Sequence, residues 1–208
     1  DNTGGSGGMY ANGHRLPDGR MMYMPDNRIQ LYFIDTLAMT VTSKPVLESS
    51  APSLAYAWLH HIGGTKFFAV SYNAATHAII DYDKNTITKF GTSNTSEKKY
   101  HGGVKLPDGR FVVVPHLSGR TSIVNPYDLT EVFIDAYRSG YIYTRGTLLQ
   151  DGNVLMSAMT YGYKKHAICD PDAMTVTDLP FALYGKNGGG AGCMLLPNGR
   201  ILFTKNDA

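Results

Sequence analysis

The sequence predicts an all-β fold, namely a β-propeller built from about five repeats of roughly 45 residues, the last one incomplete. A turn motif recurs along the chain: Leu-Pro-Asp-Gly-Arg at 16–20 and 106–110, Leu-Pro-Asn-Gly-Arg at 196–200, and weaker copies at 62–66 and 149–153. The fourth residues of these copies are Gly19, Thr65, Gly109, Gly152 and Gly199. The pentamer Ala-Met-Thr-Val-Thr also occurs twice, at 38–42 and 173–177, which indicates duplication. A period near 45 residues is typical of arrays of four-stranded units.

Each copy of the turn precedes a short, continuous hydrophobic run. These runs lie at 21–24, 67–70, 111–114, 154–156 and 201–203. Continuous apolar runs predict strands that are buried on both faces. Proline presets the first central dihedral angle of the turn and glycine supplies the positive one. The turn is therefore expected to join an inner first strand to a buried second strand as a hairpin.

A third strand is expected to end in an Asx residue in each of the first four repeats. The segments are 31–35, 77–81, 121–125 and 166–170, ending in Asp35, Asp81, Asn125 and Asp170. A short carboxylate or amide at that point can bond to the backbone two residues on, forming an Asx-turn. Threonine-rich segments at 38–42, 85–88 and 173–177 then predict the fourth strand.

The predicted domain organisation is a Gly-rich linker at 1–9 followed by a single propeller domain at 10–208. The repeats lie near 10–55, 56–99, 100–142 and 143–189, with a partial repeat at 190–208. The fifth repeat would lack two strands, which would leave an exposed sheet edge. We expect further repeats of a longer parent chain or a neighbouring chain to supply them. A third possibility is that four blades close and the last hairpin docks elsewhere.

Composition and charge exclude several functional classes. The formal net charge is +2 with 17% charged residues, too balanced for a nucleic-acid partner or a basic membrane patch. No apolar run approaches the ~20 residues of a membrane span. The two cysteines, Cys169 and Cys193, cannot form a disulfide framework and are expected to be buried free thiols. Abundant Gly and Tyr with few charges suit a virion or extracellular protein.

The order of these elements resembles a known family. Leu-Pro-Asp-Gly-Arg, a hydrophobic strand, hydrophobic-Asp-Pro and Thr-hydrophobic-Thr look like kelch-type and galactose-oxidase-like propellers, most similar to the degenerate kelch-like repeats of phage virion and tail proteins. The resemblance covers about 10–208. Two departures are a loosely kept double glycine and the replacement of the usual fourth-strand Trp by Val41, Ile87 and Val176.

Catalytic and metal-binding motifs are not evident. A galactose-oxidase-like copper site needs two Tyr, two His and a Cys; His14 and His60 share a repeat position and Cys193 falls one before it, but no motif brings such groups together. The segment 81–92 starts like a calcium loop but lacks the Gly and Glu that such a loop requires. Asp18, Asp108 and Asp151 lie on separate turns, unlike a glycosidase pair. We predict no catalytic residue, metal or cofactor.

Aromatic residues are the candidate ligand contacts. A tyrosine starts the first strand of each of four repeats, forming either a packing ring or an aromatic site at one channel mouth. The candidate ligand-binding residues are Tyr10, Tyr56, Trp58, Tyr100, Tyr143 and Arg145, with Tyr141 and Tyr161 as further loop aromatics.

The sequence therefore favours a non-enzymatic binding or structural module, a phage tail or virion component that presents loops for host-receptor recognition or assembly. Its expected partners are other virion or tail subunits, or further repeats of a parent chain, together with a host glycan or protein receptor. The alternative is a secreted carbohydrate-active enzyme or glycan-binding lectin on a kelch-like propeller, since fold alone does not decide function.

Overall fold

The computed structural model describes residues 10–25, 30–45, 55–91, 99–116, 120–134, 143–158, 165–180 and 189–206. The regular elements within these ranges are all β-strands. In the same ranges, no helix has the length and apolar character needed to cross a membrane. The chain divides into two compact units, residues 1–94 and 95–208. The predicted linker at 1–9 lies outside the described residues, and a single domain over 10–208 stays a prediction.

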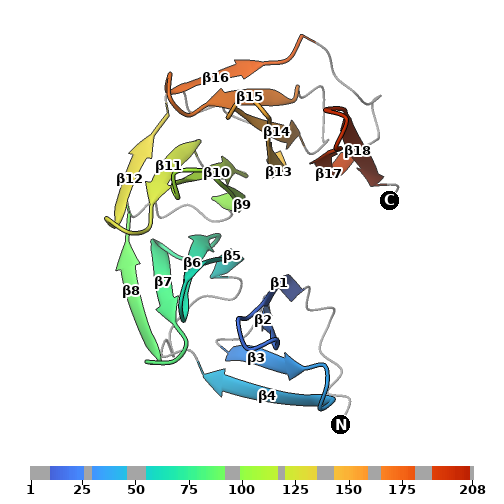
Figure 1. Ribbon diagram of the computed structural model, residues 1–208. Coiled ribbons are helices and arrows are strands. Elements are labelled where there is room, and N and C mark those ends of the chain that lie inside the picture. Colours follow the sequence, from blue (N-terminus) through green and yellow to red (C-terminus); the bar gives the residue numbers. More distant parts are fainter. Residues whose placement is uncertain are drawn as a thin grey trace. The chain divides into compact units, whose positions relative to one another are not determined.

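Unit 1 contains two four-stranded antiparallel sheets, β1-β2-β3-β4 and β5-β6-β7-β8 (Figure 1). The strands are β1 (Tyr10–Arg15), β2 (Met21–Pro25), β3 (Gln30–Asp35), β4 (Thr40–Pro45), β5 (Tyr56–Gly63), β6 (Lys66–Ser71), β7 (His77–Asp81) and β8 (Thr86–Phe90).

Unit 2 contains two further four-stranded antiparallel sheets and one two-stranded sheet, β17-β18. Its strands are β9 (Tyr100–Lys105), β10 (Phe111–Pro115), β11 (Ser122–Asn125), β12 (Thr130–Phe133), β13 (Tyr143–Leu148), β14 (Val154–Ala158), β15 (Ala167–Asp170), β16 (Thr175–Asp178), β17 (Gly189–Leu195) and β18 (Ile201–Asn206).

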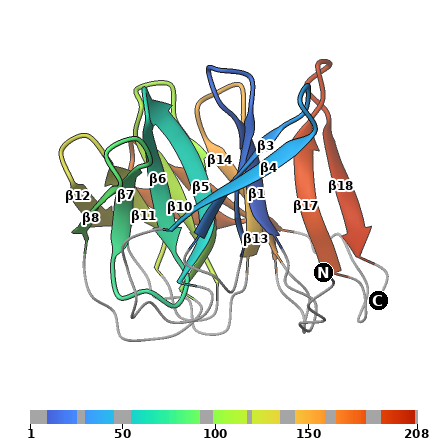
Figure 2. The same ribbon diagram turned by 90° about the horizontal axis from the view of Figure 1, so that it is seen from below.

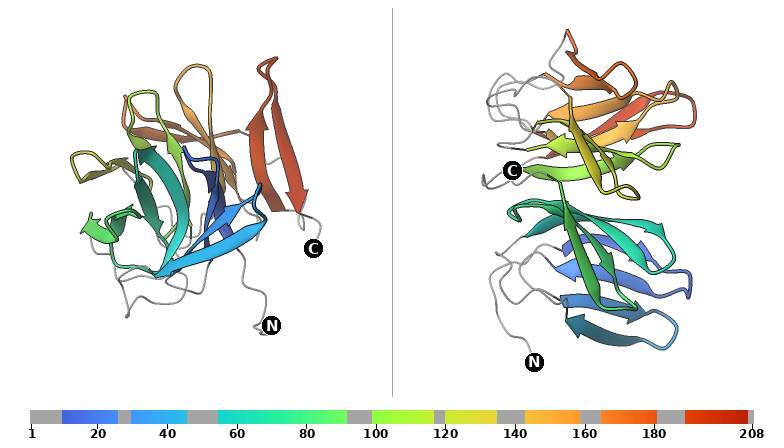
Figure 3. Two further views of the ribbon diagram at one scale, coloured as in Figure 1. Left: turned by 60° about the horizontal axis from the view of Figure 1, so that its bottom comes forward. Right: turned by 90° about the vertical axis from the view of Figure 1, so that its left-hand side faces the viewer.

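The sheets have the organisation of propeller blades. In each complete sheet the strands pair in chain order, and the sheets are twisted (Figure 3). Within unit 1, the first strands β1 and β5 adjoin; within unit 2, β9 adjoins β13 and β13 adjoins β17. Consecutive four-stranded meanders that adjoin through their first strands define a β-propeller. The predicted fold class and the two-stranded fifth repeat are confirmed.

The second strands form the centre of each unit's core, as their continuous apolar runs predict. All five residues of β10 and of β14 are buried, and in β6 only Lys66 is exposed. The core of unit 1 gathers around Phe67 and Leu59, and that of unit 2 around Tyr143, Val112 and Met156. Burial on both faces explains why these strands carry no alternation of polar residues.

The recurring turn motif is a hairpin turn with a fixed hydrogen-bond pattern. In the first copy, Gly19 N–H donates to the carbonyl of Leu16 (3.0 Å) and Leu16 N–H to that of Arg20 (2.8 Å). Three later copies repeat this pattern, and their glycines share a positive φ of 78–93° with Gly19. The β13–β14 and β17–β18 turns lie at the same side of unit 2 (Figure 2). The copy at 62–66 differs, because Gly63 pairs directly with Lys66 in a shorter hairpin.

The predicted Asx-turns join the third and fourth strands. Oδ1 of Asp35 accepts the N–H groups of Leu37 and Ala38, both at 2.9 Å, and Asp81 and Asp170 each accept two equivalent bonds. Four residues after each Asx residue, the backbone is left-handed with φ of 54–57°, at Met39, Asn85, Leu129 and Met174. Such a φ costs most L-residues about 1 kcal/mol, and Asn tolerates it better.

The Met39→Asn variant should stabilise unit 1 by about 1 kcal/mol. Met39 has a φ of 54° and its side chain is 85% exposed, so little packing is lost. Urea unfolding measures the effect, with Asn85→Met as the reciprocal control that should lose a similar amount. Equal stability of Met39→Asn and the unchanged protein would contradict this account of the turn.

A β-bulge near the start of the first strand pair recurs in all five sheets. In β5, for example, Tyr56 pairs with Ser71 and Trp58 with Val70, so Ala57 is the extra residue. Equivalent register shifts occur in the β1, β9, β13 and β17 pairings. A bulge bends its strand and re-aims the neighbouring side chains. The tyrosine that starts the strand therefore does not follow the inward–outward alternation of the residues after the bulge.

Both cysteines are free thiols, as predicted. Cys169 is buried, and burial raises the pKa of its thiol to about 12, so it stays protonated. Cys193 is half-buried rather than fully buried. It lies on β17 beside β13, where Thr147 Oγ1 donates to its carbonyl at 2.7 Å.

Candidate functional site

The predicted ligand contacts fall in both units. Tyr10 starts β1, but its side chain lies outside the described residues, as do Tyr141 and Tyr161. Tyr56 and Trp58 lie together on β5 of unit 1. Within unit 2, Tyr143 and Arg145 share β13, next to β9, which begins with Tyr100.

The tyrosines of this set are packed into the protein. Tyr56, Tyr100 and Tyr143 are 5%, 4% and 0% exposed, and Tyr56 and Tyr143 belong to the hydrophobic cores of their units. Their burial agrees with a packing role for each of these side chains within its own unit. Trp58 is half-buried and Arg145 is exposed, so these two are the more accessible members. Their role in ligand binding stays a prediction.

Tyr100 differs from the other tyrosines because it belongs to a polar cluster on the blade β9–β12. Its hydroxyl donates to Oε1 of Glu131 at 3.1 Å, and Ser122 Oγ donates to the same oxygen at 2.8 Å. Ser122 is fully buried, whereas Glu131 is half-buried. Together with Lys99, these residues form the Glu131 cluster.

Charge and burial perturb the titratable groups of the Glu131 cluster. Lys99 is only 2% exposed, and burial lowers the pKa of its ammonium, while the negative charge of Glu131 opposes that shift. Burial raises the pKa of the Tyr100 phenol well above its usual range, and the Glu131 charge raises it further. Such perturbed groups are typical of functional sites, although structural networks also produce them.

The second and fourth blades hold apolar residues at the corresponding positions, while the first blade has Tyr32 at the Ser122 position and Val41 at the Glu131 position. Strand registers align Glu131 with Ile87 in the second blade and Val176 in the fourth. The same registers align Ser122 with Ala78 and Ala167. Lys99, which precedes the tyrosine of its blade, corresponds to Ala55. The third blade has thus exchanged small or apolar side chains for a bonded, charged cluster.

Two histidines flank this cluster. The rings of His101 and His116 stack with centroids 5.1 Å apart and an interplanar angle of 26°. His116 N–H donates to the carbonyl of Lys99 at 2.7 Å, which ties the end of β10 to the residue before β9. The third blade therefore brings five titratable side chains to one region: Lys99, Tyr100, His101, His116 and Glu131.

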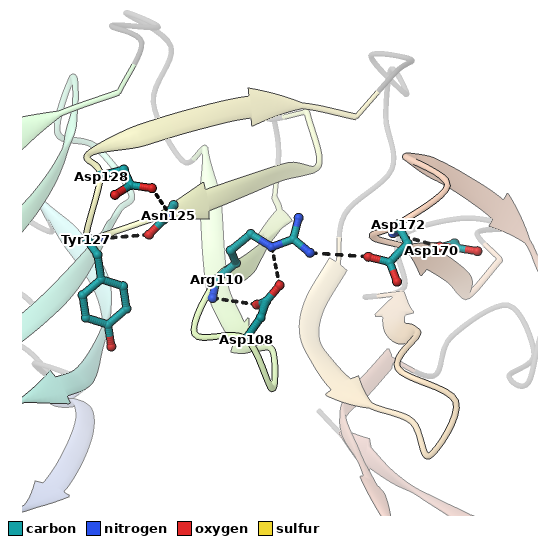
Figure 4. A network of polar contacts seen from close by, with 7 residues as sticks. All are labelled: Asp108, Arg110, Asn125, Tyr127, Asp128, Asp170 and Asp172. Atoms are coloured by element: carbon teal, nitrogen blue, oxygen red, sulfur yellow. Dashed lines mark hydrogen bonds and ion pairs between the residues drawn. The ribbon is translucent and has the colours of Figure 1, made fainter.

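The aspartates and arginines of the recurring turn have local structural roles. Arg110 donates to Asp108 Oδ2 through Nε at 2.5 Å, and its Nη2 lies 3.4 Å from Oδ1 of Asp172 on the next blade (Figure 4). Arg20 pairs with Asp18 and its guanidinium lies over the Phe33 ring at 5.2 Å. These contacts agree with the turn interpretation of the carboxylates and with arginine stems covering apolar surface.

His77 and His166, which share a repeat position, are also structural. Nδ1 of His77 accepts the N–H of Ser71 at 3.1 Å, and Nδ1 of His166 accepts that of Ala158 at 3.2 Å. Each ring also packs against phenylalanine: His77 against Phe68 and Phe90, His166 against Phe203. Duplication of one packing role explains both residues.

Acid should weaken unit 2 through His166. Burial lowers the pKa of His166, so the unfolded chain takes up a proton more readily, and stability should fall as the pH drops from about 6.5 through the lowered folded pKa. The slope from this one group is at most about 1.4 kcal/mol per pH unit. Urea unfolding between pH 7 and pH 5 measures it. His166→Thr, which copies Thr121 of the third blade, should show a shallower pH dependence; an unchanged slope would assign the effect to other groups.

Among the residues that the structure describes, no three His, Cys, Asp or Glu side chains gather in a way that could hold a metal ion. The turn carboxylates of the same residues each bond within their own turn. The Glu131 cluster is therefore the candidate functional site. Sequence reasoning singled out Tyr100 but missed Lys99, Ser122 and Glu131. The available signal was the segment Thr130-Glu131-Val132, which breaks the Thr-hydrophobic-Thr pattern of the other repeats.

Comparison with known proteins identifies the fold. No family model matches the chain, and no curated protein matches it. Among solved structures, virginiamycin B lyase from Staphylococcus aureus superposes with a TM-score of 0.74 at 13% identity, over 94% of this chain and 62% of the lyase chain. The extracellular domain of BT3049 from B. thetaiotaomicron, assigned to the hybrid two component systems, superposes with a TM-score of 0.67 at 10% identity, over 93% of this chain and 25% of that chain.

The fold is that of a β-propeller. At these identities, the likeness shows the fold and nothing about activity. The chain spans about six tenths of the length of the lyase it matches, since 62% of that lyase is covered. Propellers of this shape thus include a lyase and extracellular domains. The kelch and phage parts of the resemblance stay a prediction.

Proposed function

We propose that this chain is an extracellular binding module whose ligand contacts the third blade at the Glu131 cluster. The observation that carries the proposal is that the third blade has Ser122 where the second and fourth blades have Ala, and Glu131 where they have Ile or Val. Burying polar and charged groups costs free energy unless they are paired. A sequence that departs from its own repeat in this costly way does so most often at functional sites.

The cluster favours a ligand that donates hydrogen bonds. Glu131 is only half-buried, and the hydroxyls of Tyr100 and Ser122 fix its carboxylate by donating to Oε1. Hydroxyl groups of a glycan and ammonium groups are donors that a carboxylate can accept from. Positioning of a carboxylate by buried donors is the usual support for a specific contact.

The finer version of the proposal is a phage tail or virion component that recognises a host glycan or protein. Its support is the resemblance of the repeat sequences to kelch-like repeats, together with the propeller fold. Neighbours that are extracellular domains favour an extracellular setting.

Binding to a glycan panel tests the proposal. We expect saturable binding by the unchanged protein and a loss of at least about tenfold in affinity, or about 1.4 kcal/mol, for Ser122→Ala/Glu131→Ile. Asp172→Asn serves as the control, because this exposed carboxylate belongs to the Arg110 network outside the cluster. Glycan binding that survives the double substitution would place the site elsewhere, and an absence of binding to every glycan would contradict a lectin-like role.

The enzymatic alternative is favoured by one observation, the shifted pKa values of Lys99 and Tyr100 beside Glu131. Groups of this kind can move protons in a lyase or hydrolase. Quinupristin, which is bound in the inactive lyase structure, and a set of glycans are suitable substrates to assay. Turnover that disappears in Glu131→Gln would support an enzyme, whereas binding without turnover would support the module.

A further inference from the structure

We propose that His14 and His60 in unit 1 form a two-imidazole binding site for a borderline transition-metal ion such as Cu²⁺, Ni²⁺ or Zn²⁺. This site is separate from the Glu131 cluster, and its test does not depend on the proposed function.

The two rings come from adjoining first strands. His14 pairs with Met22 on β2 and His60 with Phe68 on β6, which places both at the same position of their blades. Strands β1 and β5 adjoin, and the ring centroids lie 6.3 Å apart with planes tilted by 57°. The Nε2 atoms of both rings are buried. Because each metal–nitrogen bond is about 2.0–2.1 Å long, two rings that share one ion lie with their centres roughly 5–6 Å apart, so the His14 and His60 rings would approach one another by a few tenths of an ångström on binding.

The His14 ring is prepared for ligation by its second nitrogen. The carbonyl of Leu59 accepts a hydrogen bond from this ring, while Nε2 has no hydrogen-bond partner among the described residues. The donor is therefore Nδ1–H, and the lone pair stays on Nε2. Metal-bound histidines usually donate their other N–H to a carbonyl or carboxylate in this way.

The repeat itself does not require this pair. The same position holds Val104, Thr147 and Met194 in the blades of unit 2. An apolar residue at this position is enough to pack the first strand, as the buried Val104 shows. The neighbouring His61 points to the other face of β5, where its Nε2 lies 2.9 Å from the carbonyl of Gly64.

The site would supply two protein ligands to the ion. No third His, Cys, Asp or Glu joins them among the described residues. Water or an oxygen or nitrogen donor from another molecule would complete the coordination. Imidazole nitrogens suit Cu²⁺, Ni²⁺ and Zn²⁺, whereas Ca²⁺ and Mg²⁺ prefer oxygen ligands.

Titration with Cu²⁺, followed by calorimetry and electron paramagnetic resonance, tests the proposal. The unchanged protein should bind one equivalent with nitrogen couplings from two imidazoles. His14→Val and His60→Val, which copy Val104, should each weaken binding at least tenfold and remove one nitrogen coupling. His61→Asn should bind as the unchanged protein does, and Ca²⁺ should not compete.

Two results would overturn the proposal: no Cu²⁺ binding by the unchanged protein, or the same affinity and nitrogen couplings in both valine variants. Circular dichroism checks that each variant is folded. If a valine variant does not fold, His14→Gln or His60→Gln replaces it, because the amide keeps a polar group at the position.

Discussion

Glu131→Ile is expected to destabilise unit 2 by about 1–3 kcal/mol, even though it introduces the residue that the second blade carries. The substitution removes the acceptor of the Tyr100 and Ser122 hydroxyls and the negative charge that favours the Lys99 ammonium. Lys99 is 2% exposed, so its charge would remain in a poorly solvated place. Leaving a buried donor or charge without its partner costs more than the pair contributes when intact.

The triple variant Lys99→Ala/Ser122→Ala/Glu131→Ile should regain that loss and equal or exceed the stability of the unchanged protein. It gives the third blade the residues of the second, namely Ala55, Ala78 and Ile87. Tyr56 is buried beside that apolar set, so a tyrosine at the Tyr100 position tolerates the surroundings. Replacing a buried charged network by apolar residues is often neutral or stabilising by about 1–4 kcal/mol.

Urea unfolding of the single, double and triple variants yields the coupling free energy of the cluster. A coupling near zero, with the three substitutions additive, would mean that the residues act independently and would remove the argument for a positioned carboxylate. If stability returns in the triple variant while glycan binding is lost, the cluster serves binding at the expense of stability. If the triple variant regains stability and still binds glycan as before, the explanation of the stability changes would hold, but the proposed function would be contradicted.

Local chemistry explains why so much of the fold could be predicted. Each turn is specified by the residues within it: Gly19 has the positive φ that its turn requires, and Asp35 accepts the backbone N–H groups that follow it. The buried second strands show as unbroken apolar runs, such as 111–114. Repetition then makes weak local signals reliable, because the same interpretation has to hold in every copy.

The candidate site could not be predicted in the same way because it depends on strand register. Tyr100, Ser122 and Glu131 lie on three different strands, and their contact follows from pairings that the sequence does not state. The bulge after each tyrosine shifts the alternation of the first strand, so a simple period of two assigns its side chains to the wrong faces. Comparing repeats position by position would have revealed Glu131 as the residue that departs from its column.

The steric fit of Gly146 gives a second large effect: Gly146→Ala should destabilise unit 2 by about 1–3 kcal/mol. A Cβ atom at this position on β13 would lie 2.5 Å from Cγ2 of Val104 and 3.0 Å from methyl carbons of Val114 and Val154. These valines belong to the buried core, and β-branched side chains have little freedom to rotate away. Strand β13, which adjoins β9 of the preceding blade, therefore has no room for a methyl group at position 146.

Gly13→Ala is the matched control, since Gly13 occupies the same blade position in unit 1. Its Cβ atom would meet the Tyr23 ring, with Cε1 at 2.4 Å, and this contact is with the far end of a half-buried side chain that can swing aside. We expect Gly13→Ala to lose clearly less than Gly146→Ala in thermal and urea unfolding. Equal losses would mean that the Tyr23 ring yields no more readily than the three valines, and would contradict the special role of close packing between β13 and β9. A larger loss for Gly146→Ala would show that the small residue there is required by the approach of one blade to the next within unit 2.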